Sequence, residues 1–173
     1  TADSKDDINK AYSLISTSKV RNDMIISDVK KSIAQNQTPV ILTRFKEHAK
    51  LLYDALKSEA DHVFLLYGDN SDKENAEIRV KLKQVPKNES LILVATGQKI
   101  GEGFDFPRLD VLMLAAPVSF EGRLEQYVGR LNRDYEGKEA VYVYDYIDAN
   151  VRFFNKMYNK RLKTYKRIGF SIW

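Results

Sequence analysis

Three polar side chains on one predicted helix have the types and the spacing to stabilise a polyphosphate. When residues 121–133 are placed on a helix at about 100° per residue, Gln126, Arg130 and Arg133 share one face. A guanidinium group is always charged and offers a fork of donors, which suits a phosphate on which negative charge builds up. The opposite, apolar face consists of Leu124, Tyr127, Val128 and Leu131. The segment therefore predicts two arginines on one stripe of an anchored helix, with Gly129 leaving room for a partner surface.

A solvated amphipathic helix explains the same pattern. Its arginines would then pair with Glu125, Asp134 or water, as exposed charges usually do. The segment alone does not decide between a phosphate-binding stripe and a solvated face, so both interpretations stay open at this point.

A glycine-rich loop, residues 96–107, is the second stretch that could do chemistry. It reads Thr-Gly-Gln-Lys-Ile-Gly-Glu-Gly-Phe-Asp-Phe-Pro, and its glycines allow a ligand to approach the backbone closely. Asp105 could accept hydrogen bonds from a ribose, and Thr96 with the neighbouring amide groups could hold a phosphate. A tight connection between two strands also explains the loop, and the loop taken alone favours that plainer explanation.

Short apolar runs alternate with helical stretches along the chain, which predicts the scaffold that positions these segments. The five expected strands are Pro39–Thr43, His62–Tyr67, Leu91–Ala95, Asp110–Ala115 and Ala140–Tyr146. Alternating strands and helices indicate an α/β fold with an open, mostly parallel sheet of five to six strands and helices on both faces. The last strand alternates more in polarity, so it is expected nearer an edge. Ligands bind beyond the carboxyl ends of such strands, and both candidate segments follow a strand.

Helical spacing of apolar residues predicts the connecting elements. The expected helices are Ile8–Ile15, Ser18–Asn36, Phe45–Ser58, Lys73–Val85 and Asn150–Arg167. Ser18 has the side chain of a helix N-cap. In Lys73–Val85 the apolar residues alternate as in a strand, but a connection between parallel strands needs a helix there. We expect two leading helices in residues 1–38, packed on or linked to one domain that spans residues 39–173.

Composition excludes several classes of function. The chain has 173 residues, of which 43% are hydrophobic and 30% charged, so one globular domain is expected. It has no cysteine, which excludes disulfides, thiolate catalysis and cysteine-ligated metals, and the histidines His48 and His62 read as structural residues. We predict no metal site on the chain. No apolar run has the roughly 20 residues that cross a bilayer, so we expect a cytoplasmic protein without a membrane partner.

Basic residues are concentrated at the carboxyl end of the chain. The segment Val151–Trp173 holds seven of the 28 basic residues and none of the 24 acidic ones, so the rest of the chain carries 21 basic against 24 acidic residues, a net charge of −3. The aromatic residues of this segment recur at helical spacing, so most are expected to pack on the sheet. Its lysines then form an outer face that either follows nucleic-acid phosphates or is simply solvated.

Together the two candidate segments resemble the signature motifs of one helicase superfamily. The run Leu93–Gly97 with Ile100–Pro107 is similar to motif V of superfamily-two helicases, and Gln126–Arg133 matches their motif VI, Q-x-x-G-R-x-x-R. Val40–Arg44 stands where motif IV belongs, and Leu66–Asp69 resembles the strand end that follows it. Within this superfamily the chain most resembles the DEAD/DEAH-box, restriction-subunit-like bacterial DNA helicases, from about Pro39 onward.

This resemblance implies a RecA-like second motor domain, with the three-layer fold of P-loop NTPases but no P-loop of its own, from an ATP-dependent DNA helicase or translocase. Arg133 and Arg130 would be arginine fingers on the γ-phosphate of ATP, and Gln126 would orient or sense that phosphate. The residues implied in nucleotide binding are Gly101, Glu102, Gly103, Asp105 and Gly129. Those implied along the nucleic-acid backbone are Thr43, Arg44, Gly68, Thr96 and Gly97.

Missing motifs indicate that the rest of the ATPase site lies elsewhere. The chain has no G-x-x-x-x-G-K-[ST] loop and no Asp-Glu pair of the D-E-x-[D/H] type. ATP with Mg²⁺ is therefore expected to bind mainly to an N-terminal RecA-like domain of the same polypeptide, upstream of Thr1, which fits a chain without an initiator methionine. We expect this fragment alone to be monomeric and inactive, with that domain and a nucleic acid, DNA by resemblance, as its partners.

Other function classes stay open on the sequence. The chain could be a non-enzymatic nucleic-acid-binding module or the domain of an RNA helicase. A freestanding α/β enzyme that binds a nucleotide at the Gly101–Asp105 loop is disfavoured, because its paired arginines would lack a catalytic carboxylate or a magnesium site.

Overall fold

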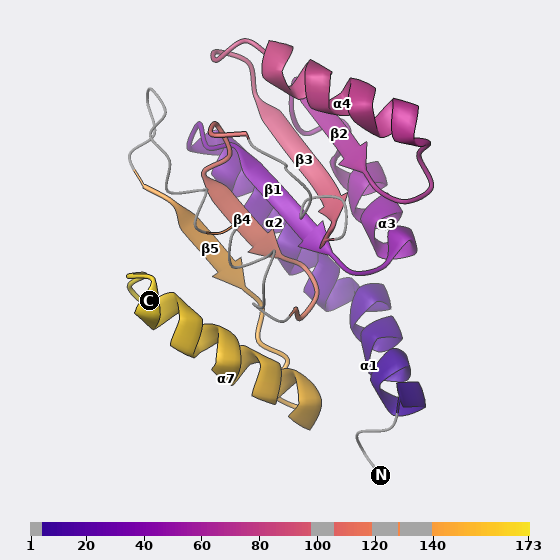
Figure 1. The fold of residues 1–173 in the computed structure, drawn as a ribbon, viewed down its shortest axis with the longest axis vertical. Helices are drawn as coiled ribbons and strands as arrows, with labels where there is room; N and C mark the ends of the chain where they lie inside the picture. Colours follow the sequence, from indigo (N-terminus) through magenta and orange to yellow (C-terminus); the bar gives the residue numbers. More distant parts are fainter. Residues whose placement is uncertain (1–4, 98–105, 119–127, 129–139) are drawn as a thin grey trace.

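The computed structural model describes residues 5–97, 106–118, 128 and 140–173 of the chain (Figure 1). Two helices precede the first strand, and strands then alternate with helical connections. The helices are α1 (Lys5–Thr17), α2 (Lys19–Ala34), α3 (Lys46–Leu56), α4 (Asp72–Gln84) and α7 (Arg152–Arg167). The strands are β1 (Pro39–Thr43), β2 (His62–Leu66), β3 (Leu91–Thr96), β4 (Val111–Leu114) and β5 (Tyr142–Asp145). None of the helices named here is long and apolar enough to cross a membrane.

The five described strands form one parallel sheet in the order β2-β3-β1-β4-β5. Strand β1 lies in the middle, with Thr43 next to Thr96 of β3 on one side and Leu42 next to Leu114 of β4 on the other. The predicted α/β fold with an open parallel sheet is confirmed. Within the described part of the chain β5 is an edge strand, as the alternating polarity of its sequence predicts.

Side chains of the central strand point alternately to the two faces of the sheet, and helices cover both faces. Val40 and Leu42 of β1 belong to the cluster that contains Leu82 of α4 and Tyr165 of α7. Ile41 between them belongs to the cluster that α2 and α3 complete. All five residues of β1 are buried, so this strand requires a helical layer on each side.

Local hydrogen bonds begin two of the helices at positions that the sequence marks. Ser18 caps α2, because its hydroxyl accepts a bond from the backbone N–H of Arg21 at 3.3 Å. At the start of α4, the hydroxyl of Ser71 accepts from the backbone N–H of Glu74, and the Glu74 carboxylate accepts from the backbone N–H of Ser71 at 2.8 Å. This capping box starts a helix where the apolar residues alternate like a strand, and the helix predicted over Lys73–Val85 is confirmed.

The first and last described helices meet at the carboxyl end of the sheet (Figure 1). Tyr12 of α1 packs with Phe154 and Met157 of α7 and with Ala116, which follows β4. The rings of Tyr12 and Phe154 lie edge to face with their centroids 4.6 Å apart. Helices α1 and α7 therefore contribute directly to the edge where ligands bind in parallel sheets. The predicted division at residue 38 stays a prediction.

Replacing Leu52 by alanine is expected to lower the free energy of unfolding by about 2–5 kcal/mol, because this α3 side chain is fully buried against the sheet and its removal leaves a cavity. Leu51, the preceding residue of the same helix, is 42% exposed, and Leu51→Ala is the matched control with an expected change within about 0.5 kcal/mol. Urea unfolding followed by circular dichroism measures both. Equal losses in the two variants would contradict the packing of α3.

Candidate functional site

Four of the predicted nucleic-acid contacts meet where two neighbouring strands end. Thr43 of β1 and Thr96 of β3 are partners in the sheet register, and Arg44 and Gly97 follow them directly in the chain. Both threonines are buried, whereas Arg44 and Gly97 are exposed. Gly68 follows β2, the strand on the other side of β3. The sheet therefore brings this predicted set to one edge.

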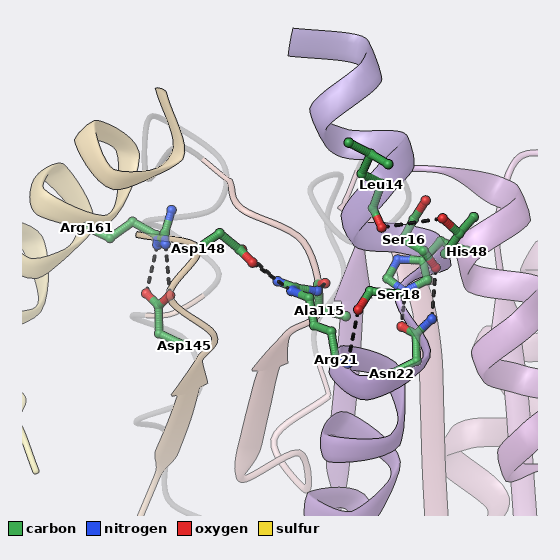
Figure 2. A network of polar contacts seen from close by, with 11 residues as sticks. Leu14, Ser16, Ser18, Arg21, Asn22, His48, Ala115, Asp145, Asp148 and Arg161 are labelled. Carbon is green, nitrogen blue, oxygen red and sulfur yellow. Dashed lines mark hydrogen bonds and ion pairs between the residues drawn. The ribbon is translucent and has the colours of Figure 1, made fainter. Parts of the chain in front are cut away.

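The hydroxyl of Thr43 belongs to an internal hydrogen-bond chain that continues through His48 and Asn22, both labelled in Figure 2. It lies 2.6 Å from Nδ1 of His48, whose Nε2 lies 2.8 Å from Oδ1 of Asn22 in α2. The amide nitrogen of Asn22 donates to the backbone carbonyl of Ser16 at 2.8 Å, so Oδ1 is the atom that faces His48. Nε2 of His48 therefore carries the proton, and Nδ1 accepts the proton of the Thr43 hydroxyl.

His48 is held in its neutral form. Burial, and after it the positive charge of Arg21, lowers the pKa of His48 from 6.5 to about 4. The ring thus links the end of β1 to α2 without carrying a charge at neutral pH. Since the Thr43 hydroxyl donates to His48, a phosphate contact at Thr43 would fall to its backbone rather than to its side chain.

Arg44 is exposed at the sheet edge, and two aromatic rings hold its guanidinium group. Its Cζ atom lies 4.4 Å from the centroid of the Tyr12 ring and 5.8 Å from that of the Phe45 ring. Such cation–π contacts limit the positions of the side chain while leaving its donors available to an anion. The role of Arg44 in nucleic-acid binding stays a prediction, and this geometry is compatible with it.

Gly68 and Gly97 leave open space at the same edge. A Cβ atom built on either residue would meet nothing within 4 Å, and neither residue has the positive φ that would require glycine. Packing therefore explains neither glycine, whereas close approach of a ligand to the backbone would.

A buried arginine of α2 fixes the backbone where β4 ends (Figure 2). Nε and Nη2 of Arg21 each donate to a different carboxylate oxygen of Asp148 at 3.0 Å, and Nη1 donates to the carbonyl of Ala115. The Arg21 side chain is only 8% exposed. A paired guanidinium group at this depth holds the loop after β5 and the residue after β4 in one geometry.

A second buried arginine, Arg161 of α7, makes the equivalent connection from the other side. It donates to both carboxylate oxygens of Asp145 at 2.7 and 2.8 Å, and to the carbonyl of Val118 at 2.9 Å. The hydroxyl of Tyr165 donates to the same carboxylate at 2.6 Å. Burial opposes the charge of Arg161, but the hydrogen bond and charge of Asp145 raise its pKa. Arg161, which the sequence groups with the outer basic residues of the carboxyl end, therefore faces inward.

Together, three side chains hold the chain that leaves β4. Besides Arg21 and Arg161, Tyr12 donates its hydroxyl proton to the carbonyl of Pro117 at 3.0 Å. The segment from Ala115 to Val118 is thus fixed by α1, α2 and α7, and in the sequence it leads to residues 119–139. Sequence reasoning did not find these three donors, although the position of Arg161 among the buried residues of α7 was a usable signal.

The predicted nucleotide-contacting residues lie outside the described residues. They are Gly101, Glu102, Gly103, Asp105, Gln126, Gly129, Arg130 and Arg133. One neighbour is described: Val128 is fully buried in the cluster with Leu112 and Leu114 of β4. The prediction that Val128 lies on a buried face is confirmed. Among the described residues, no group of three or more histidine or acidic side chains could hold a metal ion.

No family model matches the chain. Among curated proteins, the putative helicase 161L of invertebrate iridescent virus 6 is 35% identical over 119 residues, covering 69% of this chain and 23% of that protein. The transcript termination protein A18 of rabbit fibroma virus (strain Kasza) is 26% identical over 128 residues, covering 72% of this chain and 26% of that protein. The chain thus spans about a quarter of the length of the curated relatives it matches.

Solved structures share the fold. T4 UvsW matches with a TM-score of 0.73 at 22% identity, over 94% of this chain and 35% of that chain. Domain 2 of the DEAD-box helicase Mss116p, solved bound to an RNA duplex, matches with a TM-score of 0.54 at 21% identity, over 72% of this chain and 48% of that chain. The chain has an α/β RecA-like fold, which it shares with these structures. The fold that the sequence resemblance implies is confirmed.

Replacing Asp145 by asparagine is expected to lower the free energy of unfolding by about 3–5 kcal/mol, because it leaves the buried Arg161 guanidinium group without its counter-charge. Asp54→Asn is the matched control: it removes the partner of Lys50 in an exposed pair on α3, and we expect stability close to that of the unaltered chain. Thermal and urea unfolding measure both variants. If the Asp145→Asn variant were as stable as the Asp54→Asn variant, burial of the Arg161 charge would not require the Asp145 carboxylate.

Stability is also expected to fall as the pH is lowered from about 6.5 to 4. In the unfolded chain His48 becomes protonated between these pH values, whereas in the folded chain its pKa is about 4 and it stays mostly neutral. Because the unfolded chain binds the additional proton, lowering the pH favours unfolding. The contribution of this residue amounts to roughly 3 kcal/mol at pH 4. Urea unfolding over this pH range measures the loss. His48→Gln should flatten that part of the profile, and an unaltered profile in the variant would refute the assignment.

Proposed function

We propose that the chain is the second motor domain of an ATP-dependent helicase or translocase. The observation that carries this proposal is the helicase-type sheet, whose register places the ends of β1 and β3 side by side with Arg44 and Gly97 exposed beyond them. The sequence similarity to a protein named as a putative helicase supports it. The activity itself is proposed for a longer polypeptide, because the relatives are about four times as long as the matched region.

Within that motor, Arg130 and Arg133 would reach the γ-phosphate of ATP, with Gln126 orienting that group. The burial of Val128 supports this arrangement, because on the predicted helix residues 126, 130 and 133 would lie on the face opposite Val128. Gly101, Glu102, Gly103, Asp105 and Gly129 would contact the nucleotide. Hydrolysis of ATP, bound with Mg²⁺, would supply the free energy for movement. Most of the contacts to this nucleotide would come from an N-terminal RecA-like domain.

The segment that follows β4, Ala115–Val118, is held in place, and this fits the proposed role of the arginines. An arginine finger stabilises charge only when its guanidinium group is held at the reacting phosphate, and one such group can contribute a factor of about 10³–10⁵ in rate. Arg21, Arg161 and Tyr12 hold the segment Ala115–Val118, from which the chain continues toward the arginines. These three residues would act as positioning residues, since none of them touches the phosphate in this proposal.

The exposed end of the sheet would bind the nucleic-acid backbone. Arg44 would supply a cation, and the open backbone at Gly68 and Gly97 would admit phosphates closely. Thr43 and Thr96 would contribute through their backbone, since both are buried. DNA is the proposed substrate, and RNA is the alternative that the RNA-bound Mss116p domain favours.

Finer assignments belong to the same proposal. We place the chain with the restriction-subunit-like bacterial DNA helicases on its motifs alone, and the curated relatives named above are viral. A monomeric state, a cytoplasmic location and inactivity of the chain without its N-terminal domain complete the proposal.

Arg133→Ala and Arg130→Ala, made in the full-length protein, are expected to lower nucleic-acid-stimulated ATP hydrolysis by at least about 10³-fold while leaving nucleic-acid binding measurable. Lys57→Ala, at the exposed end of α3, is the control and should hydrolyse ATP normally. Phosphate release with and without DNA or RNA measures the rates. Near-normal turnover in both arginine variants would remove the proposed mechanism, and full-length protein without any ATP hydrolysis would favour a binding module.

A further inference from the structure

The exposed face of α7 carries an unbroken stripe of positive charge. At about 100° per residue, its outward cations lie within an arc of about 120°, and they extend along roughly 22 Å of helix. All of them are exposed: Arg152, Lys156, Lys160, Lys163, Lys166 and Arg167. No acidic residue occurs between Val151 and Trp173. We call these six residues the α7 stripe.

Four residues of the α7 stripe differ in their surroundings from several exposed lysines elsewhere on the described surface. On the described surface, Lys19, Lys30, Lys46 and Lys50 each lie within 4 Å of an acidic side chain. Within the same described part, no ion pair forms at Arg152, Lys156, Lys160 or Lys163. Lys166 and Arg167, in the last turn of α7, also complement the negative end of the helix dipole. The helix dipole does not explain the other four cations, which lie outside the last turn.

The opposite face of α7 is fixed to the domain, so the direction of the stripe is fixed too. Phe154, Met157, Arg161 and Tyr165 are buried, and Arg161 makes the bidentate pair with Asp145 at the end of β5. A helix held in this way fixes the backbone positions from which its outer cations extend into solvent. Self-repulsion among them is offset only if an anionic partner or counterions lie along the row.

The buried face of α7 lies beside the proposed nucleic-acid edge of the sheet. The Tyr12 ring contacts Phe154, two residues after Arg152, and the Arg44 guanidinium group lies over the same ring. One aromatic side chain therefore connects the amino-terminal end of α7 to Arg44, whereas the α7 stripe lies on the face of the helix opposite Phe154. A nucleic acid bound at Arg44 would reach the α7 stripe by passing the amino-terminal end of α7, where the exposed Arg152 lies.

We propose that the α7 stripe is a nucleic-acid-binding surface that follows the phosphate backbone of a single strand or duplex without reading its bases. A regularly charged polyanion matches a row of cations of this length, and most of the affinity would come from the release of counterions. An anionic membrane fits less well, because binding of a helix in the membrane interface needs an exposed apolar face, and that face of α7 is buried in the domain. The proposal does not depend on ATP hydrolysis or on Arg130 and Arg133.

The test is the salt dependence of nucleic-acid binding by the 173-residue chain. The probe is a fluorescein-labelled oligothymidylate of about 20 nucleotides, titrated between about 0.05 and 0.2 M salt. Replacing Lys156, Lys160 and Lys163 together by glutamine should weaken binding by roughly 100-fold at 0.1 M salt and reduce the slope of log affinity against log salt by about 2. The matched control replaces the exposed residues Lys73, Lys81 and Lys83 of α4 by glutamine, which makes the same change in net charge.

Each outcome decides the proposal. Weak binding with a reduced slope in the α7 variant only, and normal binding when the same three lysines become arginine, would support it. Equal losses in the α7 and α4 variants would overturn it in favour of net charge alone, as would an unchanged slope or no binding by the unaltered chain. Binding to phosphatidylserine vesicles or to polyglutamate as tight as to the oligonucleotide would also overturn it. If the triple variant does not fold, the single variants Lys160→Gln and Lys163→Gln should each reduce the slope by about 0.7.

Discussion

Two guanidinium groups removed from water determine the geometry of the carboxyl edge. Each buried charge is tolerable only with a counter-charge and further acceptors in good geometry. Arg21 and Arg161 obtain both, since each takes two carboxylate oxygens and one backbone carbonyl. Their carboxylates come from the end of β5 and the loop after it, whereas the carbonyls belong to the segment after β4. The edge therefore keeps its shape only while α2 and α7 stay docked.

Most of the architecture could be predicted because it depends on local periodicity. The five strands follow from short apolar runs, and the helices from apolar spacing. For α4 the apolar pattern indicated a strand, and the need for a crossover between parallel strands indicated the helix that the structure has. The order of the strands was not predicted, since pairing between β1 and its neighbours joins residues about 50–70 positions apart and leaves no local trace.

The candidate site shows the limits of prediction more clearly. Strand-end positions identified Thr43, Arg44 and Thr96 as neighbours of a ligand edge, and the register brings them together. The sequence did not show that the Thr43 hydroxyl is committed to His48, or that Arg161 turns inward while the cations around it face solvent. Both depend on a partner far along the chain, Asn22 in one case and Asp145 at a strand end in the other.

The central position of β1 has a consequence for how the protein is made. A ribosome releases the chain from its amino end, so Pro39–Thr43 emerges before β3 and β4, which cover its two edges. Some 70 further residues separate Thr43 from Leu114, which corresponds to a delay on the order of 10 s at ordinary rates of synthesis. Until β3 emerges this uncharged, strand-forming segment has no partner strand, and until β4 emerges one of its edges stays open, which is the situation in which nascent chains aggregate or recruit chaperones.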